Sequence, residues 1–290
     1  MAARSTLAAL IAGFALMHPP ALGARDANDA PAAAIALPFA PPVNTALDYR
    51  IEQAKPGRKG EELSFSRRFR LQFTHAGRGF RLDVTLVDVA AQAPDRMASA
   101  FRAALQPLLG TTIGYRLSSD GRTVYLDDPV AMRAAFDQIV EQIARAGSNG
   151  GDVAIARAAV AHLSHLDDEA LTQLLFEDVR PVLQFAHSRV EESPTDLVTD
   201  GFDLADAPVT GVTHLAIVDS DAAKVRIRET TRTARAVGND GAAPQIVSTL
   251  DYTVDRATGL ATRIDQRDTL GGDAGRIVSR KTRTIVPLGS

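Results

Sequence analysis

The feature that most constrains this fold is a long alternation of apolar and polar residues between residues 63 and 86. In LSFSRRFRLQFTH, the apolar residues that share one parity are Leu63, Phe65, Phe69, Leu71 and Phe73, and Arg67 is the exception. After the turn AGRG (76–79), the same pattern continues with Phe80, Leu82, Val84 and Leu86. Side chains of a strand point alternately to two faces, so a period of two predicts two long strands buried on one side. The short glycine-containing turn predicts that they pair antiparallel.

The period changes after residue 94. Apolar residues then recur at gaps of three and four, which predicts amphipathic helices. We expect them from Pro94 to Leu108, from Pro129 to the GSNGG stretch (147–151), over Val153–Leu163, and from Asp167 onward. A polar loop is expected at 187–201, and strands return from about residue 212 to 286.

These patterns predict an α+β fold. We expect a curved, largely antiparallel, half-barrel-like sheet of about ten strands, with a helical insertion that covers one face. The single domain would span 45–290, with strands in 45–90, a helical section with one hairpin in 94–186, and strands in 211–287. The strands at the two ends of the domain should complete one sheet. Two domains divided near residue 200 are the alternative.

The N-terminus has the features of a secretory signal peptide. Arg4 precedes the apolar run LAALIAGFALM (7–17), and small residues follow at 21–24. The run is shorter than the roughly 20 apolar residues that span a bilayer, so we expect cleavage near Gly23 or Ala24 and a periplasmic or secreted protein. A short anchor helix is the alternative. Residues 24–44 are rich in proline and alanine and are predicted to be a flexible leader, from which Ile35, Leu37 and Phe39 could pack on the folded body.

Composition excludes several classes of site. The chain has no cysteine, so it holds no disulfide, lipidated cysteine or thiolate zinc site. Its formal net charge is −3, which gives no support for nucleic-acid binding. The basic stretches SRRFRLQ (66–72) and RIRETTRTAR (226–235) are therefore interpreted as solvated outer faces of strands. No later apolar stretch suggests a transmembrane anchor in the mature chain.

The acidic stretch GYRLSSDGRTVYLDD (114–128) is interpreted as a connector. A turn at Asp120-Gly121 would place Leu117 opposite Val124 and Tyr115 opposite Leu126. Asp127 would lie diagonally from Arg116, and Asp128 would cap the helix that begins at Pro129. Each aspartate then has a structural role.

Motifs of the common catalytic and nucleotide-binding loops are absent. The metal-site candidate is HLSHLDDE, in which His162, His165 and Asp168 could bind zinc. The alternative is a solvated turn between helices, with Asp167 as a helix cap. No cofactor is expected.

The apolar strand face is the other candidate site. If the helices cover it loosely, a cavity for an apolar ligand results; if they fill it, it is a plain core. The candidate ligand-contacting residues are Phe65, Phe69, Leu71, Phe73, Phe80, Leu82, Val84 and Leu86.

An exported chain of about ten antiparallel strands with short hairpins and helices between them resembles the half-barrel carriers of the bacterial envelope, the LolA/LolB lipoprotein-localisation factors and the related LppX-type proteins. The hairpin YTVDRATGLATRI (252–264) is similar to hairpins common in these proteins. That resemblance implies an acyl chain held between a curved sheet and helices.

Three functions follow as hypotheses. The leading one is a non-catalytic periplasmic protein that binds a lipid or other apolar small molecule between sheet and helices. The second is a structural or interaction protein of the envelope with a solid core and a protein partner. The third is a hydrolase or metal-dependent enzyme that uses His162 and His165.

Overall fold

The computed structural model describes residues 33–57, 60–148, 164–202, 208–235, 246–273 and 275–288. Strands dominate these ranges, and the helices lie between β4 and β7 in the chain. The strands are β1 (Ala34–Leu37), β2 (Ala46–Pro56), β3 (Glu62–Ala76), β4 (Gly79–Gln92), β5 (Thr112–Leu117), β6 (Val124–Leu126), β7 (Ser188–Glu191), β8 (Thr195–Phe202), β9 (Pro208–Ser220), β10 (Lys224–Arg235), β11 (Ile246–Asp255), β12 (Ala261–Leu270) and β13 (Arg276–Pro287). The helices are α2 (Asp95–Leu105), α3 (Pro129–Ser148) and α5 (Asp168–Phe176), with 3-10 turns η2 (Gln106–Leu108) and η3 (Arg180–Leu183).

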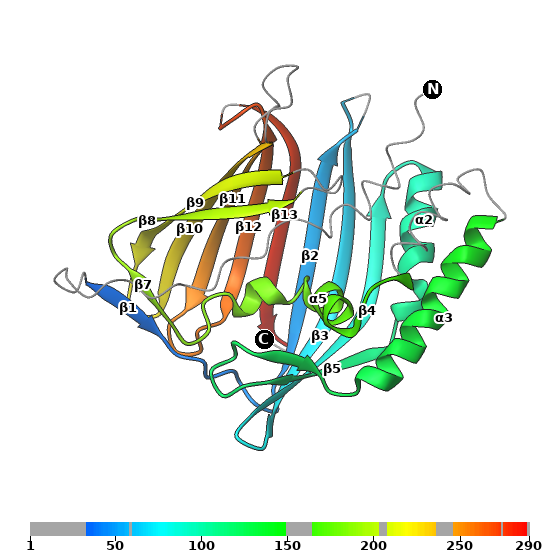
Figure 1. Cartoon of the computed structure of the whole chain (residues 1–290), viewed down its shortest axis with the longest axis horizontal. Coiled ribbons are helices and arrows are strands. Elements are labelled where there is room, and N and C mark those ends of the chain that lie inside the picture. Colours follow the sequence, from blue (N-terminus) through cyan, green and yellow to red (C-terminus); the bar gives the residue numbers. More distant parts are fainter. Residues whose placement is uncertain are drawn as a thin grey trace.

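One antiparallel sheet of eleven strands forms the body (Figure 1). Its order is β6-β5-β4-β3-β2-β13-β12-β11-β10-β9-β8, so it is open, with edges at β6 and β8. β13 pairs with β2, which joins the strands from both ends of the chain into one sheet, as predicted. The expectation of a large antiparallel sheet is therefore confirmed.

The two faces of this sheet differ in character. We call the face that carries Tyr49, Ile51 and Ile264 the packed face, because these side chains are almost completely buried. The opposite, outer face carries Asp48, Arg50 and their neighbours in register. Strand periodicity produces this division, because alternate residues of each strand face opposite sides.

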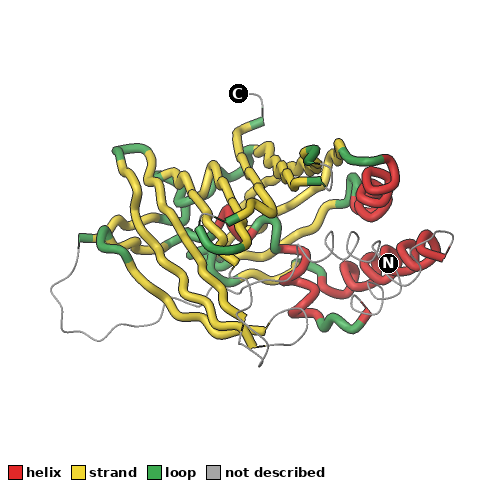
Figure 2. The backbone as a smooth tube through the Cα atoms, turned by 90° about the horizontal axis from the view of Figure 1, so that it is seen from above, coloured by secondary structure: helices red, strands yellow, loops and turns green. Residues whose placement is uncertain are grey.

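Helices cover the packed face only in part. Figures 1 and 2 show α2 and α3 gathered at the end of the sheet near β4 and β5, and Figure 1 shows α5 in front of β3 and β4. At the other end, β1 and β7 form a separate two-stranded sheet that packs on β9–β12. Ile35, Leu37, Phe185 and Val190 contribute this contact, so part of the predicted helical cover is supplied by strands instead.

The second half of the predicted leader is bound to the body rather than free. Ile35 and Leu37 are buried, and Phe39 packs edge-on against Phe80, with the ring centroids 5.1 Å apart. The backbone of the leader runs along the β11–β12 turn, where Ala40 N donates to Thr258 O at 3.0 Å. Gly259 at this turn has φ +73°, and a Cβ there would lie 1.7 Å from Pro38 O. A side chain at this position would therefore displace the leader.

Some predicted elements need correction or lie outside the described residues. The predicted polar loop at 187–201 contains β7 and most of β8. Both strands lie at sheet edges, where polar residues replace the apolar alternation that sequence patterns detect. The signal peptide and the whole of the helix expected over Val153–Leu163 fall outside the described ranges.

The 114–128 connector has the predicted geometry. Leu117 pairs with Val124, and Tyr115 pairs with Leu126. The Asp127 carboxylate accepts hydrogen bonds from both Arg116 and Arg81, and these partners hold its pKa below the usual value.

Asp128, the last aspartate of this stretch, caps helix α3. The Asp128 side chain accepts a hydrogen bond from Ala131 N at 2.9 Å, as a helix N-cap does. We predict that Asp128→Ala lowers the free energy of unfolding by about 1 kcal/mol, because one backbone donor in the first turn loses its acceptor. Urea unfolding followed by circular dichroism measures this change. Asp128→Ser, which retains a capping oxygen, should recover most of the loss; equal losses in both variants would contradict a capping role.

Candidate functional site

The eight apolar residues proposed as ligand contacts lie in packed contacts. Leu71, Phe73 and Leu82 show 0% exposure, and Phe65, Val84 and Leu86 are also buried. Phe69 and Phe80 are partly buried and pack against the cluster that contains Leu71, Phe73 and Leu82. Phe65 packs instead against Phe101 of α2, with ring centroids 5.0 Å apart.

The segment that runs from α5 through η3 fills this face. Its residues Phe176, Val179, Val182 and Leu183 join Leu71, Phe73 and their neighbours in one cluster, which we call the first cluster. A second cluster lies toward β9–β12 and contains Ile227, Tyr252 and Ile264 together with Ile35 and Leu37. In the described region, therefore, the strand face proposed for ligand binding is a core.

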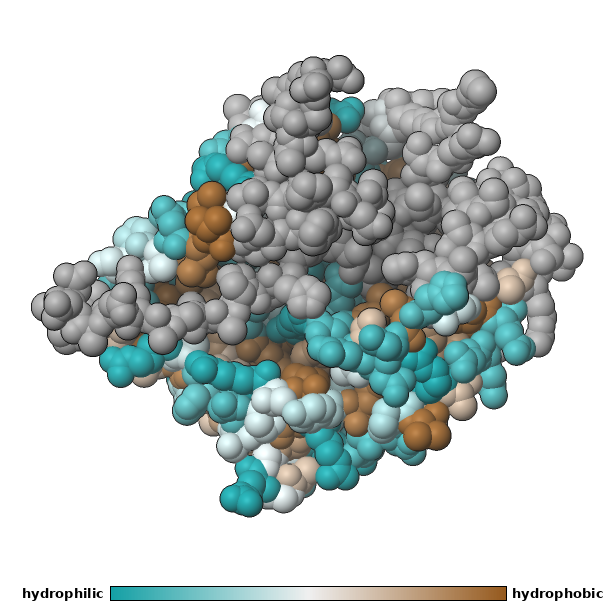
Figure 3. All heavy atoms as spheres, in the orientation of Figure 1, coloured by the Kyte–Doolittle hydropathy of each residue, from teal (hydrophilic) through white to brown (hydrophobic). Residues whose placement is uncertain are grey.

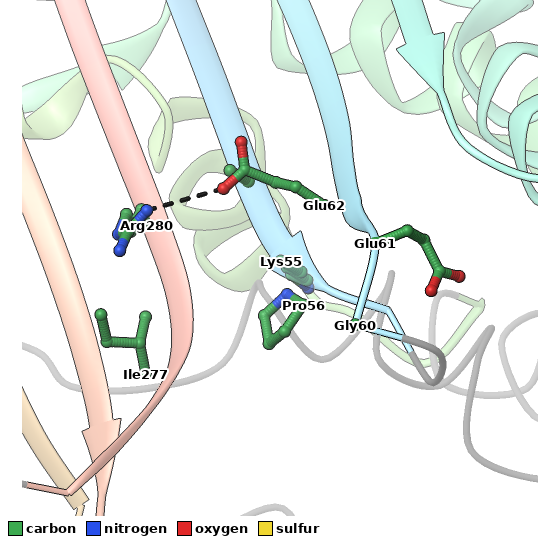
Figure 4. Close-up of a pocket in the computed structure, with 8 residues that line it drawn as sticks. Lys55, Pro56, Gly60, Glu61, Glu62, Ile277 and Arg280 are labelled. Atoms are coloured by element: carbon green, nitrogen blue, oxygen red, sulfur yellow. Dashed lines mark ion pairs between the residues drawn. The ribbon is translucent and has the colours of Figure 1, made fainter.

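Two pockets open elsewhere. One, of about 410 Å³, lies on the outer face and is lined by Asp48, Arg50, Glu52, Arg263, Thr282, Thr284 and Val286. The other, of about 140 Å³, lies where the β2–β3 loop approaches β13 (Figure 4). There, Glu62 and Arg280 form an ion pair at 3.6 Å across the opening. Neither pocket is lined by any of the eight apolar candidates.

The structure describes only part of the candidate metal set. His162 lies outside the described residues, and His165 is exposed. The Asp168 carboxylate is bound by Arg133, with Nη2–Oδ1 at 2.9 Å, and Asp167 caps α5 by accepting from Ala170 N. Within the described ranges, no three histidine or acidic side chains gather as metal ligands.

A set of charged side chains and one glutamine on the packed face is the strongest candidate site. We call it the charged band, and it consists of Arg67, Glu177, Asp178, Glu229, Gln266, Lys281 and Arg283. Strand register places four of its members on the packed face: Arg67 pairs with Ile51, Ile51 with Arg283, Lys281 with Gln53, and Gln266 with Lys281. Leu250 of β11 pairs with Gln266 on one side and with Glu229 on the other, so Glu229 lies on the same face. The band therefore crosses the middle of the sheet.

The segment after α5 delivers the two acidic residues at the centre of the band. Phe176 and Val179 are buried on either side of Glu177 and Asp178, so the packing of these neighbours holds both carboxylates against the sheet. Asp178 forms an ion pair with Arg67, whose side chains are only 16% and 12% exposed. The Tyr49 hydroxyl donates to the Asp178 backbone oxygen at 2.5 Å.

Burial changes the pKa of several groups in the band so that their neutral forms are favoured. Burial raises the pKa of Glu177 to about 7, and the adjacent Asp178 acts in the same direction. Burial lowers the pKa of Lys281 to about 8, and the positive charge of Arg283 adds to this. Burial also raises the pKa of Glu229, although its hydrogen bond with Tyr252 opposes the shift. Glu177 and Lys281 thus titrate near neutral pH, where proton exchange and ligand charge can influence each other.

Arg283 has a buried nitrogen without a hydrogen-bond partner among the described residues. It is 6% exposed, and its Nη1 donates to Gln266 Oε1 at 3.2 Å. The Gln266 amide nitrogen in turn donates to Asp268 Oδ1 at 3.1 Å. Among the described residues, two buried side-chain polar atoms have no hydrogen-bond partner: Arg283 Nε and the Tyr115 hydroxyl.

Sequence reasoning missed the charged band. The alternation that identified β3 already marked Arg67 as a charged residue on the apolar face, and Lys281 and Arg283 share the parity of Ile285 on β13. Glu229 likewise shares the parity of Ile227, although the charges of this strand were expected on the outer face. The exposed Arg226, Arg228 and Arg232 do lie there, as expected.

This arrangement can bind a charged or polar group and can exchange protons near neutral pH. Comparison with known protein families found no family model that matches the chain, and comparison with curated proteins found no similar sequence. Among the described residues, no helix combines the length and apolar character needed to cross a membrane.

The Arg67–Asp178 pair gives a test of the site's structural part. We predict that Arg67→Met lowers the free energy of unfolding by about 3 kcal/mol, because Asp178 then remains largely buried without its cation. Arg67→Met combined with Asp178→Leu should recover most of this loss, as measured by urea unfolding. Arg228→Met is the control, because the Arg228–Asp251 pair is exposed on the outer face and should contribute no more than about 1 kcal/mol. Equal losses at Arg67 and Arg228 would contradict the assignment.

Glu177 predicts a pH dependence of stability. Its pKa is raised from 4.5 to about 7, so the folded state binds more protons than the unfolded state between these values. The contribution of Glu177 to stability therefore falls as pH rises from about 4.5 to about 7 and stays reduced above. Glu177→Gln should match the native protein near pH 5 and have the higher Tm at pH 8, measured by calorimetry. The control is Glu169→Gln at an exposed site of α5; a native-like pH profile in Glu177→Gln would exclude the shift.

Proposed function

We propose that this chain is an exported, periplasmic binding protein that holds an amphiphilic molecule, such as a lipid, on the packed face. The N-terminal sequence pattern supports export. The proposed role is binding and carriage rather than catalysis, in agreement with the resemblance to the envelope carriers. The ligand's position differs from the one expected from sequence, because the β3–β4 apolar face is occupied by the α5–η3 segment.

The observation that carries this proposal is the position of the charged band. Arg283 has Ile51 beside it on β2 and Ile264 beside it on β12, so buried charge lies directly between the first and second clusters. A molecule with one polar end and one apolar end could contact both kinds of surface here. Leu215, Ile217 and Leu250 are partly buried apolar residues next to the second cluster and can receive the apolar end.

A second candidate is a structural or interaction protein of the envelope. It is supported by the filled first cluster and by exposed apolar side chains on neighbouring strands at the β8 edge. Val198 and Val212 pair across β8 and β9, with 69% and 41% of their surfaces exposed. Such a pair could form part of a contact with another protein.

Ligand binding distinguishes these two candidates. The full chain is to be purified after export, freed of bound lipid, and titrated with dodecanoate and dodecanol while native mass spectrometry and Tm are recorded. A binding protein should retain at least one of these amphiphiles and gain thermal stability, because ligand binds the folded state.

Two variants locate the binding face. Leu250→Gln on the packed face should weaken binding of whichever amphiphile binds, whereas Val286→Gln, exposed on the outer face, should leave it unchanged. Absence of binding to either compound, with a protein partner recovered by crosslinking in the envelope, would favour the interaction protein.

A further inference from the structure

Arg283 is a cation on the packed face that forms no ion pair with a carboxylate among the described residues. Its side chain is 94% buried, and its neighbours in register are the apolar residues Ile51 and Ile264. Among the described residues, its side chain has one hydrogen-bond acceptor, the neutral Gln266 amide, at 3.2 Å. A guanidinium has five N–H donors, so the described residues satisfy only a small part of its capacity, and Nε has no partner among them.

The surroundings make this cation more costly rather than less. Lys281 is two residues away on the same face of β13, about 7 Å along the strand. The Asp178 carboxylate, which is close enough to influence Lys281, is bound to Arg67. The phenols nearest to Arg283, Tyr49 and Tyr252, stay neutral because burial holds the pKa of each well above its usual range. Glu177, the other carboxyl that influences Lys281, has a pKa raised to about 7, so below that pH positive charge is in excess beside Arg283.

The role of Arg67 provides a direct comparison on the same face. Arg67 is also largely buried, but a carboxylate of the chain compensates it and anchors the α5–η3 segment. Burying an uncompensated charge costs several kcal/mol, so a buried arginine without a carboxylate calls for an anion from another source. Guanidinium N–H groups match the geometry of oxyanions, and such charge-assisted bonds are strong.

We propose that Arg283 is the binding site for an oxyanion, a carboxylate or phosphate, that forms the head group of the ligand. This inference rests on the proposed function, since it assigns a chemical class to the polar end of the proposed amphiphile. Lys281, on the same face of β13, supplies a second positive charge. The uncharged apolar end extends toward Leu250 and the second cluster.

The test compares an acid with an alcohol of the same chain length, and a free anion with a chain-linked one. Dodecanoate, dodecanol and inorganic phosphate are each titrated into the full chain at pH 6. The native protein should bind dodecanoate about tenfold to a hundredfold more tightly than dodecanol, the range expected for a hydrogen bond to a charged group. Binding of phosphate alone at Arg283 would identify a free anion as the source, and binding of dodecanoate without phosphate would identify a lipid head group.

Three variants separate a binding role from a structural one. Arg283→Met should remove the preference for the acid and leave dodecanol binding unchanged, and Arg283→Lys should restore only part of it, because lysine lacks the fork of donors. The control is Arg280→Met, exposed on the outer face of the same strand, which should keep the native preference. Arg283→Met should also raise the Tm of the ligand-free protein, because a buried unpaired cation is replaced by an apolar side chain.

The outcomes have distinct meanings. Equal binding of acid and alcohol by the native protein, or an unchanged acid preference in Arg283→Met, overturns the oxyanion site while the proposed binding function stands. Binding of neither amphiphile nor phosphate overturns both. A large fall in the Tm of Arg283→Met without any ligand overturns the inference as well, because Arg283 then serves the fold.

Discussion

The antiparallel pairing of β13 with β2 is the contact on which the rest of this structure depends. The ladder from Arg280↔Ala54 to Pro287↔Leu47 joins strands from the two ends of the chain into one sheet. It also sets the geometry of the charged band, since Arg67 and Arg283 lie on either side of Ile51 in register. Two strand spacings separate their backbones by about 10 Å. The same ladder completes the first cluster, because Ile285 packs with Leu47, Tyr49 and Ile51. One set of backbone hydrogen bonds therefore builds both the core and the candidate site.

Local patterns in the sequence were sufficient for much of this fold. Alternation broken only at Arg67 located β3 and β4, because a strand buried on one side leaves a direct period-two signal. The connector at 114–128 was predicted down to its register, since a glycine turn fixes which residues face each other, and the Pro129 helix start identified Asp128 as its cap. These elements share one property: the residues that determine each structure are neighbours in the chain.

The candidate site could not be predicted in the same way, because its members come from β3, β10, β12, β13 and the α5–η3 segment. Nothing local to Asp178 indicates that Arg67, 111 residues earlier, is its partner. The parity of Arg67, Lys281 and Arg283 did place them on apolar faces. However, arginine and lysine are rarely buried, so a charged residue of the wrong parity is more easily interpreted as an irregularity of the strand. The filling of the β3–β4 face was also a tertiary outcome, decided by where Phe176, Val179 and Val182 pack. The export signal and His162 lie outside the described residues, so those expectations keep their standing as hypotheses.

The charged residues of the packed face divide into two groups with different physical roles. Arg67, Asp178 and Tyr49 bind one another and fix the position of the α5–η3 segment on the sheet, so their burial is compensated within the fold. Arg283 makes no contact of that kind: among the described residues its acceptor is a side-chain amide, and that amide also serves the Asp268 network. Removing Arg283 would therefore break few of the contacts that define the structure, although keeping it buried is costly. Stability that a fold gives up without a structural return is typical of residues retained for binding. That contrast, on one face of one sheet, is the physical reason to look for function at Arg283 rather than in the apolar core.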